Sequence, residues 1–560
     1  MIRRMRKIYS KELIVFITVL MILLLPLSPF TTGKTKGKIG THASNLTLVD
    51  VDLPSNSTGS STGTLAVRIY TPTHTRYQDG APVLIYVPGG DSRGGLRNCL
   101  PSVGDDLVTI YFIFPGGNDP QSGRSSDGVY DHRGLNCILA LRDVILYAAG
   151  KITDSLGRTI DEILPIPILH NNIGLLGVSN GGNIVVAVAA LHDTELADYL
   201  RYVIQWESPV SSQIATVDLG PIRFNCSPND FVNPRYLAYD PLTLVVDYSD
   251  LAYDSTNSQV PIFHDGNGDG HYTTILHPIT GLPTPDLDLD GELETNEDFP
   301  LWSYTYTDGT KDVYSRPVTH ALADNAIFSV WPSDIATPEE ADTYWDLREA
   351  VRLYDEALIN IPDLHGMILA SVKDHVQSAP DKPHIHQAFD GWNSNNAWVK
   401  INPSPSYLIE VDPTLIGRTD LPDNIPNIPP SNWSDYNYCI PEDIPDSIYQ
   451  LAAIWEMADR TYNNQWYTLE IKNIRGGFGI SAIVKNIGRE DILDAQWSID
   501  VSGLVFIGSH TEGTTSIPAG GEGTIKSGFI LGIGPATVTI NVGGTTKTAS
   551  CFVLGSLVLV

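Results

Sequence analysis

The stretch GVSNGG at residues 177–182 is the part of this sequence best suited to chemistry. An apolar run at residues 173–178 leads into it, and a predicted helix at residues 181–191 follows it. A serine between glycines, at a strand-to-helix junction, is typical of the sharp turn that exposes a nucleophilic hydroxyl. The helix N-terminus behind that turn favours developing negative charge. The sequence therefore predicts Ser179 as a nucleophile for acyl transfer.

A second glycine-rich stretch, PGG at residues 88–90, follows a predicted strand at residues 83–87. A loop of this kind supplies one backbone N–H to an oxyanion, and the residue after the nucleophile supplies another. We therefore expect Gly90 or Asp91, together with Asn180, to form an oxyanion hole.

A carboxylate follows a late apolar strand, in the stretch SVKDHV at residues 371–376. Asp374 suits the acid that orients an imidazole and stabilises its cation. It also follows Ser179 in the chain order serine, acid, histidine.

These three elements together resemble the α/β-hydrolase superfamily, and in particular its secreted esterases and prolyl-oligopeptidase-like hydrolases. The resemblance covers residues 65–466 and implies a mechanism but no particular substrate. It also implies a catalytic histidine in the loop after the last strand of the sheet. This sequence departs from that pattern, because its only histidine beyond residue 397 is His510, in the C-terminal region.

Three earlier histidines are left as candidates for the base: His375, His384 and His386. His375 directly follows the predicted acid, where a side chain normally turns away. The other two lie near the start of a helix predicted from Pro383, and they cannot both face the same way. We favour His384 as the base.

A second chemical site is predicted at residues 286–297, DLDLDGELETNE. The stretch matches the twelve-position calcium loop, with glycine at position six and glutamate at position twelve. We expect Ca²⁺ to be bound by the residues Asp286, Asp288, Asp290, Glu292 (through its carbonyl) and Glu297. A similar start at residues 265–270 reaches Leu276 at its twelfth position, so it is a weaker candidate.

The elements that must position these residues alternate between strands and helices. Strands are predicted at residues 65–70, 83–87, 108–114, 173–178, 202–206, 367–372 and 397–401. Helices are predicted at residues 135–149, 181–191, 337–358, 383–392 and 448–458. This alternation indicates an α/β fold with a mainly parallel sheet covered on both faces.

The domain boundaries follow from shifts in composition. Residues 62–462 are the predicted α/β-hydrolase domain, and residues 208–334, rich in Asp, Pro and Gly, are an insertion with its own organisation. Residues 463–560 carry short strand patterns separated by Gly-rich turns, which predicts an Ig-like β-sandwich. Residues 31–61 are rich in Ser, Thr and Gly and are predicted to be a linker.

The N-terminus and the overall charge indicate where the protein works. Basic residues precede an apolar run at residues 13–27, so residues 1–30 are predicted to be a signal peptide or a membrane anchor. We expect an extracellular protein that meets the membrane only through that segment. Sixty-five acidic and 35 basic residues give a net charge of −30, which argues against nucleic-acid binding.

The expected function is that of a serine hydrolase acting on a small-molecule ester or a peptide. Its C-terminal domain would act as a spacer or contact a cell surface or polymer. The alternative, from another class, is a calcium-binding cell-surface protein that keeps the fold without turnover; the missing late histidine favours it. No zinc, nucleotide or dinucleotide motif is present.

Overall fold

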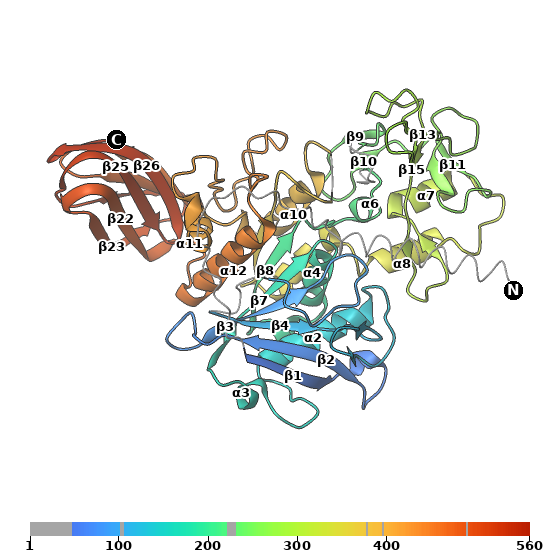
Figure 1. The fold of residues 1–560 in the computed structure, drawn as a ribbon, viewed down its shortest axis with the longest axis horizontal. Coiled ribbons are helices and arrows are strands. Elements are labelled where there is room, and N and C mark those ends of the chain that lie inside the picture. Colours follow the sequence, from blue (N-terminus) through green and yellow to red (C-terminus); the bar gives the residue numbers. More distant parts are fainter. Residues whose placement is uncertain (1–46, 101–105, 221–230, 377–378, 395–396, 489–490) are drawn as a thin grey trace. The chain divides into compact units, whose positions relative to one another are not determined.

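The computed structural model describes residues 47–100, 106–220, 231–376, 379–394, 397–488 and 491–560, so the predicted signal or anchor segment lies outside the described residues. The largest element is an eight-stranded sheet in the order β1-β2-β4-β3-β7-β8-β18-β19 (Figure 1). Its strands are β1 (Thr47–Pro54), β2 (Thr64–Thr71), β3 (Ala81–Val87), β4 (Val108–Phe112), β7 (Ile168–Val178), β8 (Leu200–Trp206), β18 (His365–Leu369) and β19 (Val399–Ile401).

The sheet is mainly parallel, as the alternating pattern predicted. β1 and β2 are antiparallel to their neighbours, whereas every pairing from β4 to β19 is parallel. The carboxyl ends of six strands therefore meet at one edge, where ligands bind in open α/β sheets. The fold is an α/β-hydrolase sheet with an additional all-β region.

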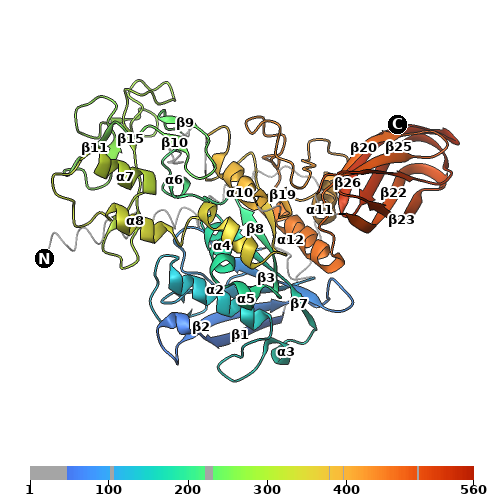
Figure 2. The same ribbon diagram turned by 180° about the vertical axis from the view of Figure 1, so that it is seen from behind.

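Helices cover both faces of the sheet (Figures 1 and 2), because successive strand residues point to opposite sides. On one face, Leu175 packs in a core with helices α2 (Leu135–Ala148) and α4 (Gly181–Leu191). On the other face, its neighbour Leu176 packs in a core with α12 (Asp446–Asn463). The two cores hold β7, and hence the turn that carries Ser179, between helices.

The segment between β8 and β18 contains short strands and a small apolar core of its own. That core includes Leu251, Ile262, Phe299, Val318 and Leu322, the last two on helix α7 (Arg316–Asp324). The segment also packs beside the predicted active-site loop, because Val376 lies in a cluster with Ile214, Leu219 and Leu244.

The C-terminal region forms two antiparallel sheets, in the orders β20-β21-β24 and β23-β22-β25-β26-β27. Their strands are β20 (Leu469–Arg475), β21 (Ser481–Asn486), β22 (Ile492–Ile507), β23 (His510–Ile517), β24 (Glu522–Lys526), β25 (Leu531–Val542), β26 (Thr545–Gly555) and β27 (Leu557–Leu559). Apolar residues from both sheets share one core, which is the sandwich arrangement. The Ig-like topology stays a prediction.

Two predicted elements need correction. The predicted linker runs to residue 61, but residues 47–54 form β1, whose Val51 and Leu53 are buried. Average composition hid this alternation of apolar and polar residues. The single helix predicted at residues 337–358 is instead two, α8 (Pro338–Trp345) and α9 (Tyr354–Asn360), with a short 3-10 turn at Ala350–Arg352 between them.

None of the helices within the described ranges has the length and apolar character needed to span a bilayer. Four of the five cysteines fall in the described part of the chain, and all four are free thiols.

Candidate active site

Ser179 lies at the carboxyl end of β7, in the turn that leads into α4. Its backbone is left-handed, with φ of +49°, which is uncommon for a residue with a side chain. Its N–H donates to the carbonyl oxygen of Trp206, the last residue of the neighbouring strand β8, at 2.8 Å. The side chain is partly exposed. This strained strand-to-helix turn is the geometry predicted for a nucleophilic serine.

The glycines around this turn are needed because backbone segments approach each other closely. A Cβ on Gly89 would lie 2.7 Å from the carbonyl oxygen of Val178 and 2.8 Å from Cβ of Ser179. A Cβ on Gly181 would lie 2.5 Å from the carbonyl oxygen of Val87. The PGG loop therefore rests directly against the serine turn.

The two predicted oxyanion donors have available N–H groups. Neither the Gly90 N–H nor the Asn180 N–H donates a hydrogen bond within the described ranges. The Asn180 side chain instead donates from Nδ2 to the Gly90 carbonyl at 3.2 Å, which ties the two donors to each other.

The predicted acid and base, Asp374 and His384, do come together. Nε2 of His384 lies 2.8 Å from Oδ2 of Asp374. Both side chains are buried, however: His384 is 0% exposed and Asp374 is 1% exposed. The other ring nitrogen of His384, Nδ1, is buried without a hydrogen-bond partner. The enclosed imidazole therefore presents neither ring nitrogen at the surface of the site.

A different acid and imidazole meet at the rim of the same edge. Nδ1 of His375 lies 2.5 Å from Oε2 of Glu207, and the His375 N–H donates to the same oxygen at 3.2 Å. Oε1 of Glu207 accepts from the Ser371 hydroxyl at 2.5 Å. Glu207 is buried, whereas 40% of the His375 side chain is exposed. Within the described ranges no hydrogen bond or ion pair involves His375 Nε2.

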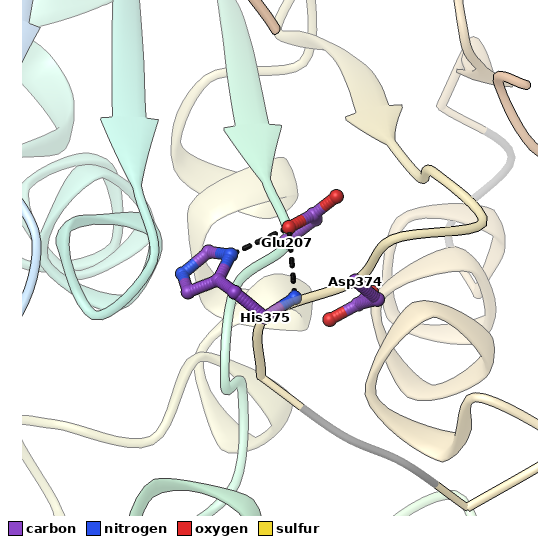
Figure 3. Close-up of side chains that lie close together, drawn as sticks. All are labelled: Glu207, Asp374 and His375. Atoms are coloured by element: carbon purple, nitrogen blue, oxygen red, sulfur yellow. Dashed lines mark hydrogen bonds and ion pairs between the residues drawn. The ribbon is translucent and has the colours of Figure 1, made fainter. Parts of the chain in front are cut away.

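The sheet register places Glu207 beside Ser179. Val178 pairs with Trp206 across the parallel strands β7 and β8, so Ser179 and Glu207 are the next residues of adjacent strands. Adjacent strands run about 4.8 Å apart. Figure 3 shows His375 and Asp374 pointing to opposite sides of the loop that carries them, with the imidazole against Glu207. The His375 ring also packs 5.1 Å from the Trp206 ring.

Burial and charge shift the pKa values of this pair. Burial, with the nearby charge of Asp374, raises the pKa of Glu207 against the opposing effect of His375. Burial lowers the pKa of His375, but the hydrogen bond and charge of Glu207 outweigh it and leave the pKa raised. For Asp374, burial is outweighed by the charge and hydrogen bond of His384, which hold its pKa well below its usual range.

His386, the third candidate, is held in an aromatic stack. Its ring lies 3.6 Å from the Tyr239 ring and 4.1 Å from the Trp433 ring. This packing gives His386 a structural role between α10 (Pro383–Asn393) and the chain around it.

The assignment of His384 as base thus stays a prediction, and the geometry favours His375 for that role. Sequence reasoning missed Glu207 altogether. The signal is present in the sequence, because Glu207 directly follows the apolar strand at residues 202–206, which is the kind of placement that favours Asp374 as the acid. The order Ser179, Glu207, His375 also keeps the chain order of the fold.

The predicted calcium loop folds around two buried carboxylates. Oxygen atoms of Asp286, Asp288 and Glu297 lie within 4.8 Å of one another. Oδ1 of Asp286 accepts from the Leu289 N–H at 2.6 Å, and Oε2 of Glu297 accepts from the Glu294 N–H at 3.1 Å. Three carboxylates so close supply the hard oxygen ligands that Ca²⁺ prefers.

The other two predicted ligands lie outside that cluster. Asp290 and Glu292 are exposed, and Oδ1 of Asp290 accepts from the Glu292 N–H at 2.9 Å. Gly291, at the sixth position, has φ of +96°, so the sharp turn expected there is present.

No family model and no curated protein matches this sequence. Solved structures with similar segments include an α/β-hydrolase from Penicillium sp. sh18 (12% identity, TM-score 0.28, covering 64% of this chain and 89% of that one). A bacterial heroin esterase is 15% identical, with TM-score 0.22, over 36% of this chain and 53% of that one. An esterase from Pyrobaculum calidifontis is 17% identical, with TM-score 0.19, over 30% of this chain and 47% of that one. This chain spans about half the length of these two esterases. At such low scores the evidence for the fold is the strand order of the sheet itself.

Proposed function

We propose that this protein is a serine hydrolase that cleaves an ester or peptide bond through an acyl-enzyme on Ser179. His375 is the base, and Glu207 orients it. The observation that carries the proposal is a strained, partly exposed serine at the end of β7 and, at the end of the neighbouring strand β8, a buried glutamate that binds the imidazole of His375. Each group has the protonation chemistry that acyl transfer needs.

The reaction divides into two steps. Nε2 of His375 takes the Ser179 proton as Oγ attacks the substrate carbonyl, and the oxyanion accepts hydrogen bonds from the N–H groups of Gly90 and Asn180. The tetrahedral intermediate collapses, and the imidazolium gives its proton to the leaving alcohol or amine. Water, deprotonated by His375, then attacks the acyl carbon. The bond to Oγ breaks as the imidazolium returns its proton to Ser179, and the acid is released.

Glu207 has two roles in this mechanism. Its hydrogen bond to Nδ1 fixes the ring and leaves Nε2 as the nitrogen that exchanges the proton. Its charge stabilises the imidazolium that forms in each step. No hydrogen bond joins Ser179 Oγ to an imidazole within the described ranges. Such contacts often form only when substrate is bound.

We also propose an extracellular location, because basic residues precede an apolar run in the N-terminal segment. We further propose a structural Ca²⁺ bound by Asp286, Asp288 and Glu297. The loop lies in the segment that packs beside the His375 loop. Arg235 donates to the Glu297 carbonyl at 2.9 Å, and the hydroxyl of the next residue, Tyr236, donates to Asp381 at 2.8 Å. Calcium would act on the stability of this segment and on access to the site.

Hydrolysis of a short acyl ester, such as p-nitrophenyl acetate, tests the function. The wild-type chain should turn over, Ser179→Ala should lose turnover, and both should melt alike, since the partly exposed hydroxyl fills no core volume. Turnover retained by Ser179→Ala would refute the proposal. A folded wild-type chain that turns over neither esters nor peptides would instead support the alternative, a binding protein without turnover.

A further inference from the structure

Arg133 is a buried arginine beside the PGG loop, and its role is not explained by the groups that react. It is 3% exposed and lies in the loop just before α2. Its Nη2 donates to the carbonyl of Pro88 at 2.8 Å and to that of Ser92 at 2.9 Å, with the Gly89 carbonyl at 3.5 Å. One guanidinium thus holds the loop at both ends.

The bonds to Arg133 constrain the direction of the loop's N–H groups. In a trans peptide the C=O and N–H point to opposite sides. Carbonyls of Pro88 and Gly89 that face Arg133 therefore turn the N–H groups of Gly89 and Gly90 away from it. The same loop contacts Ser179 through Gly89. The loop lies between the guanidinium and the serine turn.

The guanidinium of Arg133 forms no ion pair in the part of the chain that the structure describes. Within the described ranges no carboxylate oxygen lies within 4.0 Å of its nitrogens, and its Nε and Nη1 are buried without hydrogen-bond partners. The guanidinium carbon instead lies 4.5 Å from the Phe114 ring centroid. A buried cation without a counter-ion is costly to keep, and its field acts strongly in an environment of low dielectric constant.

The backbone that carries Arg133 is strained, and other side chains hold it in place. His132 and Arg133 have φ values of +52° and +68°. Arg348 donates from Nε to the His132 carbonyl at 2.6 Å and from Nη2 to the Asp131 carbonyl at 2.7 Å. Strain in consecutive residues persists where the surroundings fix it, and it is concentrated at functional sites.

The same segment also holds the loop through Asp91. The Asp91 carboxylate accepts from the Tyr130 hydroxyl at 2.8 Å and lies 2.9 Å from Nδ1 of His132. Residues 130–133 therefore hold the loop through its carbonyls and through the side chain next to Gly90.

We propose that Arg133 is a positioning residue of the oxyanion hole: it orients the backbone N–H groups of the PGG loop and places a buried positive charge behind them. This inference rests on the proposed function, because it assigns Arg133 to the stabilisation of the same oxyanion. The stabilisation acts on the transition state more than on the bound substrate. Loss of Arg133 therefore lowers kcat and leaves KM nearly unchanged.

The test compares Arg133→Gln and Arg133→Lys with the wild type in the full chain. A fluorophosphonate titrates the competent active sites, so that kcat is expressed per site and a loss of folded protein does not count as a loss of rate. The affinity for an alkyl boronic acid, which forms a tetrahedral adduct on the serine, reports on stabilisation of the oxyanion. Arg124→Gln is the matched control, because Arg124 donates to the carbonyls of Val67 and Val51 at the far strands of the sheet.

We expect Arg133→Gln to lower kcat per site by about 10- to 100-fold, somewhat less than the loss of a direct oxyanion donor, with KM within about threefold. Boronate affinity should weaken by the same factor as kcat/KM. Arg133→Lys keeps the charge but loses the Nη2 group that donates to the loop carbonyls, so it should fall between Gln and the wild type. The control should keep wild-type kcat per site.

A kcat per site within about twofold of wild type in both Arg133 variants would overturn the inference. So would an equal loss in Arg124→Gln, or a loss confined to KM. If Arg133→Gln does not fold, Arg133→Lys decides alone, since unchanged kcat and boronate affinity in that variant contradict a role for the bonds from Nη2 to the loop carbonyls. Wild-type protein without turnover or labelling refutes the proposed function itself, whereas active wild type with unaffected variants refutes only the role of Arg133.

Discussion

Oε2 of the buried Glu207 carboxylate lies 2.5 Å from Nδ1 of the half-exposed His375 imidazole. The bond occupies the ring nitrogen that faces the interior and leaves Nε2 without a partner within the described ranges. The pair of His384 and Asp374 has the opposite property, since the unbonded nitrogen of His384 is buried. The two candidate bases, His375 and His384, are therefore expected to respond differently when each is replaced by alanine.

His375→Ala should lower kcat by about 10³-fold or more, because Ser179 loses its base. His384→Ala should act mainly on stability, since it leaves the buried Asp374 carboxylate without its imidazole partner. His386→Ala is the control for a histidine in the same region. The measurements are kcat per titrated site and the melting temperature of each variant. A larger loss of kcat per site in His384→Ala than in His375→Ala would restore His384 as the base.

The pH profile of kcat/KM should reflect the raised pKa of His375. The base must be neutral to accept the Ser179 proton, so activity rises with pH through the His375 pKa. The midpoint of this acid limb should lie above 6.5, the ordinary value for histidine. Glu207→Gln removes the charge that favours the imidazolium, so the midpoint should move to lower pH while the plateau rate falls.

Asp374→Asn is the matched control for that experiment. Asp374 also raises the pKa of His375, but only after Glu207 in importance, so its effect on the midpoint should be smaller. An acid limb in Glu207→Gln that stays in place, or moves to higher pH, would show that another group titrates.

Gly181→Ala should disrupt the serine turn. The new Cβ would lie 2.5 Å from the Val87 carbonyl and 2.7 Å from the Pro88 carbonyl, so the loop and the helix must separate. We expect a loss of stability of roughly 1–3 kcal/mol together with most of the activity. Gly95→Ala is the comparison, since no atom lies within 4 Å of a Cβ at that position. Similar melting and activity in the two variants would mean that the close approach at Gly181 is absent.

Removal of calcium should lower the melting temperature or expose the segment around residues 286–297 to protease. Without a cation, the close carboxylates of Asp286, Asp288 and Glu297 repel one another. Calcium at a hundredfold excess over its Kd stabilises the folded form by about 2.7 kcal/mol. Glu297→Gln should reproduce part of the effect of chelator, and Glu292→Gln, at an exposed position, should not. Identical melting curves in chelator and in millimolar calcium would leave only an acidic loop.

Much of the fold could be predicted from periodicity, because buried strands and amphipathic helices leave strong local patterns. The strand that ends at Val178 and the helix that begins at Gly181 are found as predicted, and with them the position of Ser179. β1 was missed because its edge position buries only one face and leaves alternating polar residues. Tertiary packing, which the sequence pattern does not contain, divides the helix predicted at residues 337–358.

The partners of Ser179 were harder to predict, since they depend on which strand ends are neighbours in space. Asp374 and His384 satisfy every local rule for an acid and a base, yet the exposure of a side chain is a property of the whole fold. Glu207 and His375 lie 168 positions apart in the chain. Only the pairing of β8 with β7 and β18 places Glu207 beside the serine turn and His375 against Glu207.

Whether Ser179 is an activated nucleophile can be measured by labelling the intact protein with a fluorophosphonate and mapping the modified peptide by mass spectrometry. We expect one phosphonylated residue, Ser179, with labelling that is lost in Ser179→Ala and slowed by about 10³-fold or more in His375→Ala. Folded wild-type protein that stays unlabelled, or that is labelled on another residue, would contradict it.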